Sequence, residues 1–154
     1  MNHEVSFGYN GGMSLKGEVN GHEMILDADE SFGGNDQGPR PKPLILASLI
    51  GCTSLDVISL LKKMRVDFKD LQVTATGSLT DEHPKYYDYI KLTYNIWGKD
   101  LNRDKVEKAV VYSQERYCGV TAMLEKAAKI DYEIVYHEDR KSTRLNSVTW
   151  PSRM

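Results

Sequence analysis

The stretch ASLIGCTSLDVISLLKKMR, residues 47–65, predicts the helix around which the fold is built. Apolar residues occur on almost every side of this stretch, and no proline interrupts it. A helix that is apolar all round is expected at the centre of a protein or of an assembly. Because Pro43 suits a first helical turn, we predict a central, buried helix from about Leu44 to Met64.

One side of this predicted helix is polar. At about 100° per residue, one stripe carries four polar side chains: Ser48, Cys52, Asp56 and Ser59. A carboxylate such as Asp56 is not buried beside apolar groups without a partner. The stripe therefore indicates a cleft, a subunit partner or a buried polar network. Core packing is the other interpretation of Cys52, because a free cysteine packs as a small hydrophobe.

Short segments of alternating polarity surround the helix and predict a mixed fold. Asn-Gly pairs at residues 10–11 and 20–21 are typical of tight hairpin turns. Residues 29–43 are too rich in glycine and proline for regular structure. Strands are expected within residues 4–28, 71–79, 86–97 and 130–138, and further helices within 101–117, capped by Asn102, and within 118–128. The order βββ-α-ββ-αα-β is that of an α+β fold.

Length and charge narrow the class of protein. The 154 residues suit one domain, which we predict over residues 1–138, followed by a disordered or non-native tail over 139–154. A net charge of −2 gives no attraction to nucleic acid, and we expect neither a nucleic-acid nor a membrane partner. The N-terminus has no signal-peptide pattern, so we expect a cytoplasmic protein whose cysteines are free, catalytic or redox-sensing.

Cys118 is the second of the two cysteines in the sequence. It stands at a helix junction just before Gly119, and the first turn of a helix favours a thiolate. Local sequence therefore makes Cys118 the better nucleophile, with capping or core packing as the other interpretation. Neither cysteine lies in a Cys-x-x-Cys motif, so the sequence predicts no metal site and no cofactor.

The segments around the cysteines resemble a known family. GPRPKPLILASLIGCTSLDVISLLKKMR, residues 38–65, is similar to the Gly-Cys helix block of the OsmC/Ohr family. ERYCGVTAML, residues 115–124, is similar to that family's Tyr-Cys-x-Val segment. The resemblance covers about residues 4–136. It implies an OsmC-like fold in which two chains form an intertwined homodimer around long central helices.

The resemblance also implies thiol peroxidase chemistry in stress or detoxification. Cys52 would be the peroxidatic thiol, which attacks an organic hydroperoxide and becomes a sulfenic acid. Cys118 would resolve that sulfenic acid as an intramolecular disulfide. The implied reductant is a small dithiol or a lipoyl protein.

The residues that activate the peroxidatic thiol in this family differ here. Pro43 occupies the position expected for a glutamate, and no arginine occurs near residues 30–32. The candidate activating or polar partners are Arg40, Lys42, Asp56 and Glu115. The alternative function is a non-catalytic dimer of the same fold that binds a small apolar or acyl ligand. Its cysteines would line the pocket or sense redox state.

Overall fold

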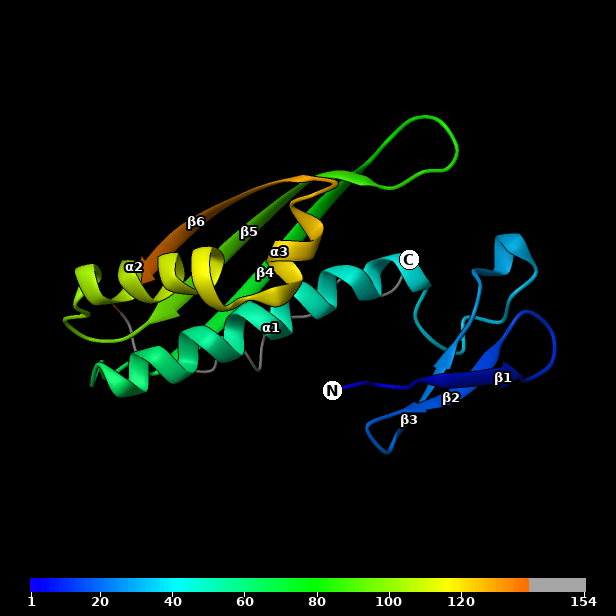
Figure 1. Cartoon of the computed structure of the whole chain (residues 1–154), viewed down its shortest axis with the longest axis horizontal. Coiled ribbons are helices and arrows are strands. Elements are labelled where there is room, and N and C mark those ends of the chain that lie inside the picture. Colours follow the sequence, from blue (N-terminus) through cyan, green and yellow to red (C-terminus); the bar gives the residue numbers. More distant parts are fainter. Residues whose placement is uncertain (139–154) are drawn as a thin grey trace. The chain divides into compact units, whose positions relative to one another are not determined.

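The computed structural model describes residues 1–138. The tail expected over residues 139–154 lies outside the described residues, and the single domain over 1–138 stays a prediction. The chain forms two compact units, Met1–Ile45 and a second that begins at Leu46. Figure 1 shows the elements of both, and each unit is described by itself below.

The first unit contains a three-stranded antiparallel sheet, as the sequence predicts. Its strands β1 (Ser6–Tyr9), β2 (Leu15–Val19) and β3 (His22–Leu26) are paired in the order β1-β2-β3. The β2–β3 turn has positive φ at Asn20 and Gly21, as a type I′ hairpin requires. The β1–β2 connection spans residues 10–14 and is longer than the two-residue turn predicted from Asn-Gly.

One buried carboxylate organises the loop that follows β3. Asp27 is only 4% exposed, and its carboxylate accepts hydrogen bonds from the backbone N–H groups of Ala28 (2.7 Å), Asn35 (3.2 Å) and Gln37 (3.0 Å). The loop contains a short 3-10 helix, η1 (Glu30–Phe32). The hydrogen bond from Gln37 is the largest of the effects that hold the pKa of Asp27 below its usual value. The ionised carboxylate therefore holds the loop closed on itself.

This carboxylate predicts a pH-dependent contribution to stability. Because the folded-state pKa of Asp27 is lowered, its contribution is complete above the unfolded-state pKa of about 3.9 and is lost as pH falls through the folded-state value. The free energy of unfolding of the wild type should exceed that of Asp27→Asn at pH 7. The difference should shrink towards pH 3. Urea titrations at both pH values measure it, and a difference independent of pH contradicts the prediction.

Helix α1 (Pro41–Lys63) is the longest helix that the structure describes. It begins three residues before the predicted start, and both Pro41 and Pro43 fit its first turn. Its buried residues recur every fourth position, at Leu49, Thr53, Val57 and Leu61.

The burial of α1 differs from the prediction of a helix that is buried all round. Within the single chain only one stripe is buried, and Leu55 remains 69% exposed. Among the described helices, α1 alone is long and apolar enough to cross a membrane, a test that core helices of soluble proteins also pass. Leu46, Ile50 and Leu60 beside this stripe are partly buried against the core, whereas Ile45 and Leu55 remain exposed.

The second unit contains a mixed sheet with one covered face. Strands β4 (Asp70–Leu79), β5 (Tyr87–Trp97) and β6 (Lys129–His137) form it, with β4–β5 antiparallel and β5–β6 parallel. Alternate residues of β5 are buried, from Ile90 to Ile96. Since successive side chains of a strand point to opposite faces, one face of the sheet forms the core. In Figure 1 the helices of the second unit lie alongside this sheet.

The helical segment between β5 and β6 is broken in a way that the sequence did not predict. The single helix expected over residues 101–117 is instead α2 (Arg103–Tyr112) followed by a π-helical turn, η2 (Ser113–Tyr117). Cys118 then begins α3 (Gly119–Leu124). The overall order of strands and α-helices is the predicted βββ-α-ββ-αα-β.

Asn102 caps α2 as predicted, and its Oδ1 accepts a hydrogen bond of 3.1 Å from the backbone N–H of Lys105. Replacing a capping asparagine by alanine costs about 1 kcal/mol. Asn102→Ala should therefore lower the free energy of unfolding in urea by about that amount, whereas Asn102→Asp should retain most of it. Equal stability of the wild type and Asn102→Ala would show that this cap contributes nothing.

Candidate active site

The two cysteines, far apart in the sequence, meet in the second unit. Cys52 belongs to α1 and Cys118 joins η2 to α3. Both are free thiols. The two sulfur atoms and a carboxylate oxygen of Asp56 all lie within 4.8 Å of one another. Rotation of the side chains is needed to reach the sulfur–sulfur bond length of about 2.05 Å in a disulfide.

Two backbone contacts hold Cys118 in place. Its N–H donates to the carbonyl oxygen of Ser113 at 2.8 Å, which closes the π-helical turn. Its Sγ accepts from the backbone N–H of Thr121 at 3.3 Å, so the side chain caps α3. Capping was one of the two interpretations that the sequence left open for this residue.

The two thiols differ in exposure. Cys118 is 4% exposed, whereas Cys52 is half-buried. Burial raises the pKa of the Cys118 thiol and outweighs the hydrogen bonds from Thr121, which lower it, while the neighbouring Cys52 raises it further. The start of α3 therefore does not lower the pKa of the Cys118 thiol, which is the effect that local sequence predicted.

A buried polar network lies beneath the cysteines. Thr53 Oγ1 is 2.6 Å from the hydroxyl of Tyr94 on β5 and 2.8 Å from Ser113 Oγ on η2. Gln114 Nε2 donates to the same Tyr94 hydroxyl at 2.8 Å and to Thr53 Oγ1 at 3.2 Å. Burial is the main cause that raises the pKa of Tyr94 to about 12, so this phenol stays protonated and remains a donor.

The network connects the sheet to Asp56 in one direction. Ser113 Oγ donates to Asp56 Oδ2 at 3.0 Å, because an ionised carboxylate can only accept. Ser113 must then accept from Thr53, and Thr53 from Tyr94. Each hydroxyl thus donates its hydrogen bond in the direction of the carboxylate. The network therefore fixes the orientation of the Asp56 side chain beside the cysteines.

A second branch of the network reaches the other cysteine. Thr121 Oγ1 donates to Gln114 Oε1 at 3.3 Å, and the backbone N–H of Thr121 donates to Cys118 Sγ. Sequence reasoning offered a buried polar network as one interpretation of the stripe that contains Asp56, but it identified none of the partners Thr53, Tyr94, Ser113 and Gln114. The one visible signal of the network is Thr53, a hydroxyl on the apolar stripe of α1, while the roles of Ser113 and Gln114 depend on the π-helical turn.

Three other candidate partners were named from the sequence. Arg40 and Lys42 belong to the first unit, where Arg40 pairs with Asp36 at 2.7 Å and with Asp29 at 3.8 Å. Glu115 is exposed on η2. Within the second unit, Asp56 is the candidate partner whose carboxylate lies beside both sulfur atoms.

A cavity of about 330 Å³ lies beside Asp56. It is lined by Asp56, Ser59, Leu60, Lys63 and Tyr117. The predicted polar stripe therefore faces a cleft at its Asp56 and Ser59 end. Lys63 brings a cation to the same cavity, a role that sequence reasoning did not assign.

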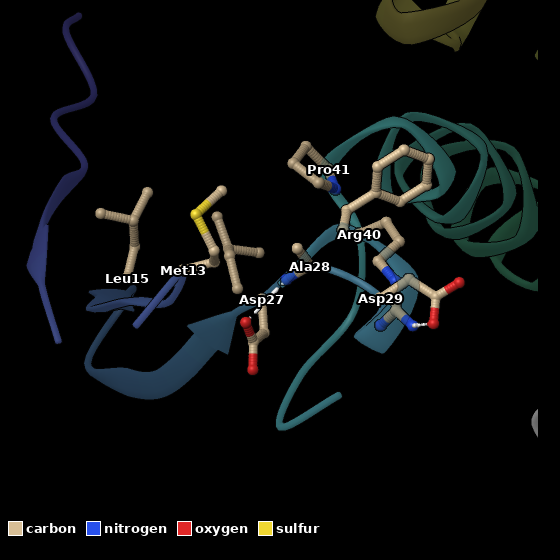
Figure 2. A pocket seen from close by; sticks show the side chains of 9 residues that line it. Met13, Leu15, Asp27, Ala28, Asp29, Arg40 and Pro41 are labelled. Carbon is tan, nitrogen blue, oxygen red and sulfur yellow. Dashed lines mark hydrogen bonds and ion pairs between the residues drawn. The ribbon is translucent and has the colours of Figure 1, made fainter. Parts of the chain in front are cut away.

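The first unit holds a separate, mainly apolar cavity of about 480 Å³. Apolar side chains from the sheet and from η1 line it, together with three charged residues: Met13, Leu15, Leu26, Ala28, Phe32, Pro41, Asp27, Asp29 and Arg40. Figure 2 shows the ion pair between Arg40 and Asp29 beside the apolar side chains.

Comparisons with known proteins agree with this architecture. A family model described as OsmC-like protein matches residues 33–133. Protein YhfA of Escherichia coli strain K12 is 36% identical over 127 residues, which cover 80% of this chain and 92% of YhfA.

Solved structures show the same fold. A hypothetical protein from Aquifex aeolicus superposes with a TM-score of 0.76 at 28% identity, covering 90% of this chain and 99% of that one. The organic hydroperoxide resistance protein OhrB of Bacillus subtilis superposes with a TM-score of 0.62 at 16% identity, covering 87% and 98%. Because the family model spans well over half of the sequence, this chain belongs to the OsmC-like protein family.

Proposed function

We propose that the protein is a thiol-dependent peroxidase that reduces organic hydroperoxides through Cys52 and Cys118. The observation that carries the proposal is the approach of two free thiols, from distant segments, to within 4.8 Å beside a carboxylate. The names of fold relatives such as OhrB of Bacillus subtilis point to the same class of substrate.

The exposure of the two thiols supports an order of events. Cys52 is the more accessible thiol, and its thiolate attacks the terminal oxygen of the hydroperoxide. The O–O bond breaks, Cys52 becomes a sulfenic acid, and the alkoxide takes a proton to leave as an alcohol.

Cys118 then resolves the sulfenic acid. Its sulfur attacks the Cys52 sulfur, the S–S bond forms, and the S–O bond breaks as hydroxide leaves. Burial raises the pKa of Cys118, so its proton must be removed in this step, and the Asp56 carboxylate lies within reach of the sulfur. That proton and the hydroxide make water. A small dithiol or a lipoyl protein then reduces the disulfide and is itself oxidised to a disulfide.

A stoichiometric reaction tests the proposal. Reduced protein, freed of reductant, receives one equivalent of cumene hydroperoxide per chain. We expect the loss of both free thiols, a mass decrease of two hydrogens, and a peptide that links Cys52 to Cys118. Dithiothreitol should restore the thiols and support repeated turnover. Two thiols that persist after excess hydroperoxide rule the proposal out.

We further propose that two chains form the intertwined homodimer that the resemblance implies, in the cytoplasm. The exposed apolar side of α1, with Leu55 at 69% exposure, supports it, because obligate interfaces are largely apolar. Leu55→Lys should convert a dimer into a monomer in sedimentation equilibrium. The matched control is Met123→Lys, which places the same charge at an exposed position of α3 and should leave the dimer intact. A monomeric wild type contradicts the prediction.

The apolar cavity of the first unit favours a second candidate function. At about 480 Å³ it falls within the range of small-molecule pockets, about 300–1,000 Å³. Arg40 at this cavity could pair with the head group of an acyl ligand. Native mass spectrometry of the purified protein would then show a bound apolar molecule, in a protein that leaves hydroperoxide unchanged.

A further inference from the structure

The cysteine pair and Asp56 form a set of three ligand atoms from two segments of the chain. We propose that the reduced protein binds one Zn²⁺ ion per chain through Cys52 Sγ, Cys118 Sγ and a carboxylate oxygen of Asp56. These three atoms lie within 4.8 Å of one another. In a tetrahedral zinc site with bonds of about 2.3 Å to sulfur and about 2.0 Å to oxygen, ligand atoms are about 3.5–3.8 Å apart. The three atoms would therefore have to move closer together on binding, and each belongs to a side chain with rotatable bonds.

Hydrogen bonds from neighbouring residues orient the proposed ligands, as is usual for metal ligands. Ser113 Oγ donates to Asp56 Oδ2 at 3.0 Å, and this hydrogen bond leaves further lone pairs on the carboxylate for a cation. Ser113 is itself held by Thr53. The backbone N–H of Thr121 donates to Cys118 Sγ, which orients that sulfur. Two of the three ligands are therefore already positioned in the structure.

The remaining side of the site is accessible. Cys52 is half-buried, and Asp56 lines the cavity of about 330 Å³ that also contains Ser59 and Tyr117. A cation can enter through this cavity, and a water molecule can complete the coordination. Three protein ligands and one water are the usual composition of an open zinc site.

The combination of two sulfur ligands and one oxygen ligand determines which metal ion the site prefers. Two thiolates favour soft or borderline cations and disfavour Mg²⁺ and Ca²⁺, which prefer oxygen ligands. The carboxylate, a harder donor, favours Zn²⁺ over Cu(I). Binding releases the two thiol protons, and the sulfur atoms keep their oxidation state.

Zinc binding and disulfide formation exclude each other, because both use the same two sulfur atoms. The zinc-bound protein should be protected from oxidation and alkylation. The disulfide form should release the ion. The site would therefore couple the redox state of the pair to zinc occupancy, independently of whether the pair turns over hydroperoxides.

Competition with a chromophoric zinc chelator tests the site. The full chain is reduced, freed of reductant without air, and titrated with Zn²⁺ alone. We expect one ion per chain in the wild type. Binding should be lost in Cys52→Ser and in Cys118→Ser, and weakened at least about tenfold in Asp56→Asn. The matched control, Asp67→Asn, changes an exposed carboxylate and should bind as the wild type does.

Several results would overturn the proposal. These are undiminished binding in Cys52→Ser, equal affinity in Asp56→Asn and the wild type, and absence of competition with the chelator. A readout on the wild type needs no variant to fold. One equivalent of Zn²⁺ should slow the alkylation of both cysteines by N-ethylmaleimide, and an unchanged rate at either residue also overturns the site.

Discussion

Cys52→Ser should abolish the dithiol-dependent consumption of organic hydroperoxide, with a fall in turnover of at least about 10³-fold, because the serine hydroxyl cannot replace a thiolate nucleophile. The half-buried position of Cys52 allows a hydroperoxide to approach it, whereas Cys118 is 4% exposed. Turnover is measured as the loss of cumene hydroperoxide with dithiothreitol in excess. A Cys52→Ser variant with unchanged turnover would remove the basis for the proposed function.

Cys118→Ser is the matched control, because it leaves the attacking thiol in place. In this variant one equivalent of hydroperoxide should still be consumed, and Cys52 should accumulate as a sulfenic acid that dimedone traps. Repeated turnover should fall, because the sulfenic acid is no longer resolved within the chain. If Cys118→Ser loses the first turnover while Cys52→Ser keeps it, the two roles are reversed.

Thr53→Val should have the largest effect on stability among substitutions in the polar network. Valine has nearly the same shape but no hydroxyl, so Tyr94 and Ser113 each lose a hydrogen-bond partner in a fully buried environment. A buried polar group left unsatisfied costs about 1–3 kcal/mol. We expect the free energy of unfolding to fall by about 2–4 kcal/mol in urea titrations.

Thr53→Ser is the control for this prediction. It keeps the hydroxyl and removes one methyl group, so it should cost about 1 kcal/mol. A similar loss in both variants would show that packing at this position, and not the network, supplies the stability. Because Ser113 orients Asp56, Thr53→Val should also weaken the proposed zinc binding, whereas Thr53→Ser should preserve it.

Local patterns in the amino-acid sequence predicted most of the fold. Alternating polarity identified the strands, and the polar stripe identified the side of α1 that carries Cys52 and Asp56. The cap at Asn102 was also correct, because its contact with Lys105 lies within one helical turn. These features depend on neighbours in the sequence, and sequence reasoning reaches them for that reason.

Features that depend on distant segments were missed. The burial of Cys118 reverses the expectation based on the start of a helix, because desolvation outweighs the backbone hydrogen bond. The role of the Tyr94 hydroxyl depends on its contacts with Thr53 and Gln114, which belong to other segments of the chain. No local pattern distinguishes a π-helical turn from the end of an ordinary helix, so the position of Ser113 could not be predicted.

The π-helical turn at Ser113–Tyr117 makes the spacing of this segment as important as its composition. A π-helical turn accommodates one residue more than an α-helical turn closed by i→i+4 hydrogen bonds. If one exposed residue, such as Glu115, were deleted, the segment could close as a regular α-helix, and everything after it would rotate by about 100°. Cys118 would then turn away from Cys52. The segment therefore acts as a spacer. Its number of residues determines the position of Cys118, even where its exposed side chains can be replaced.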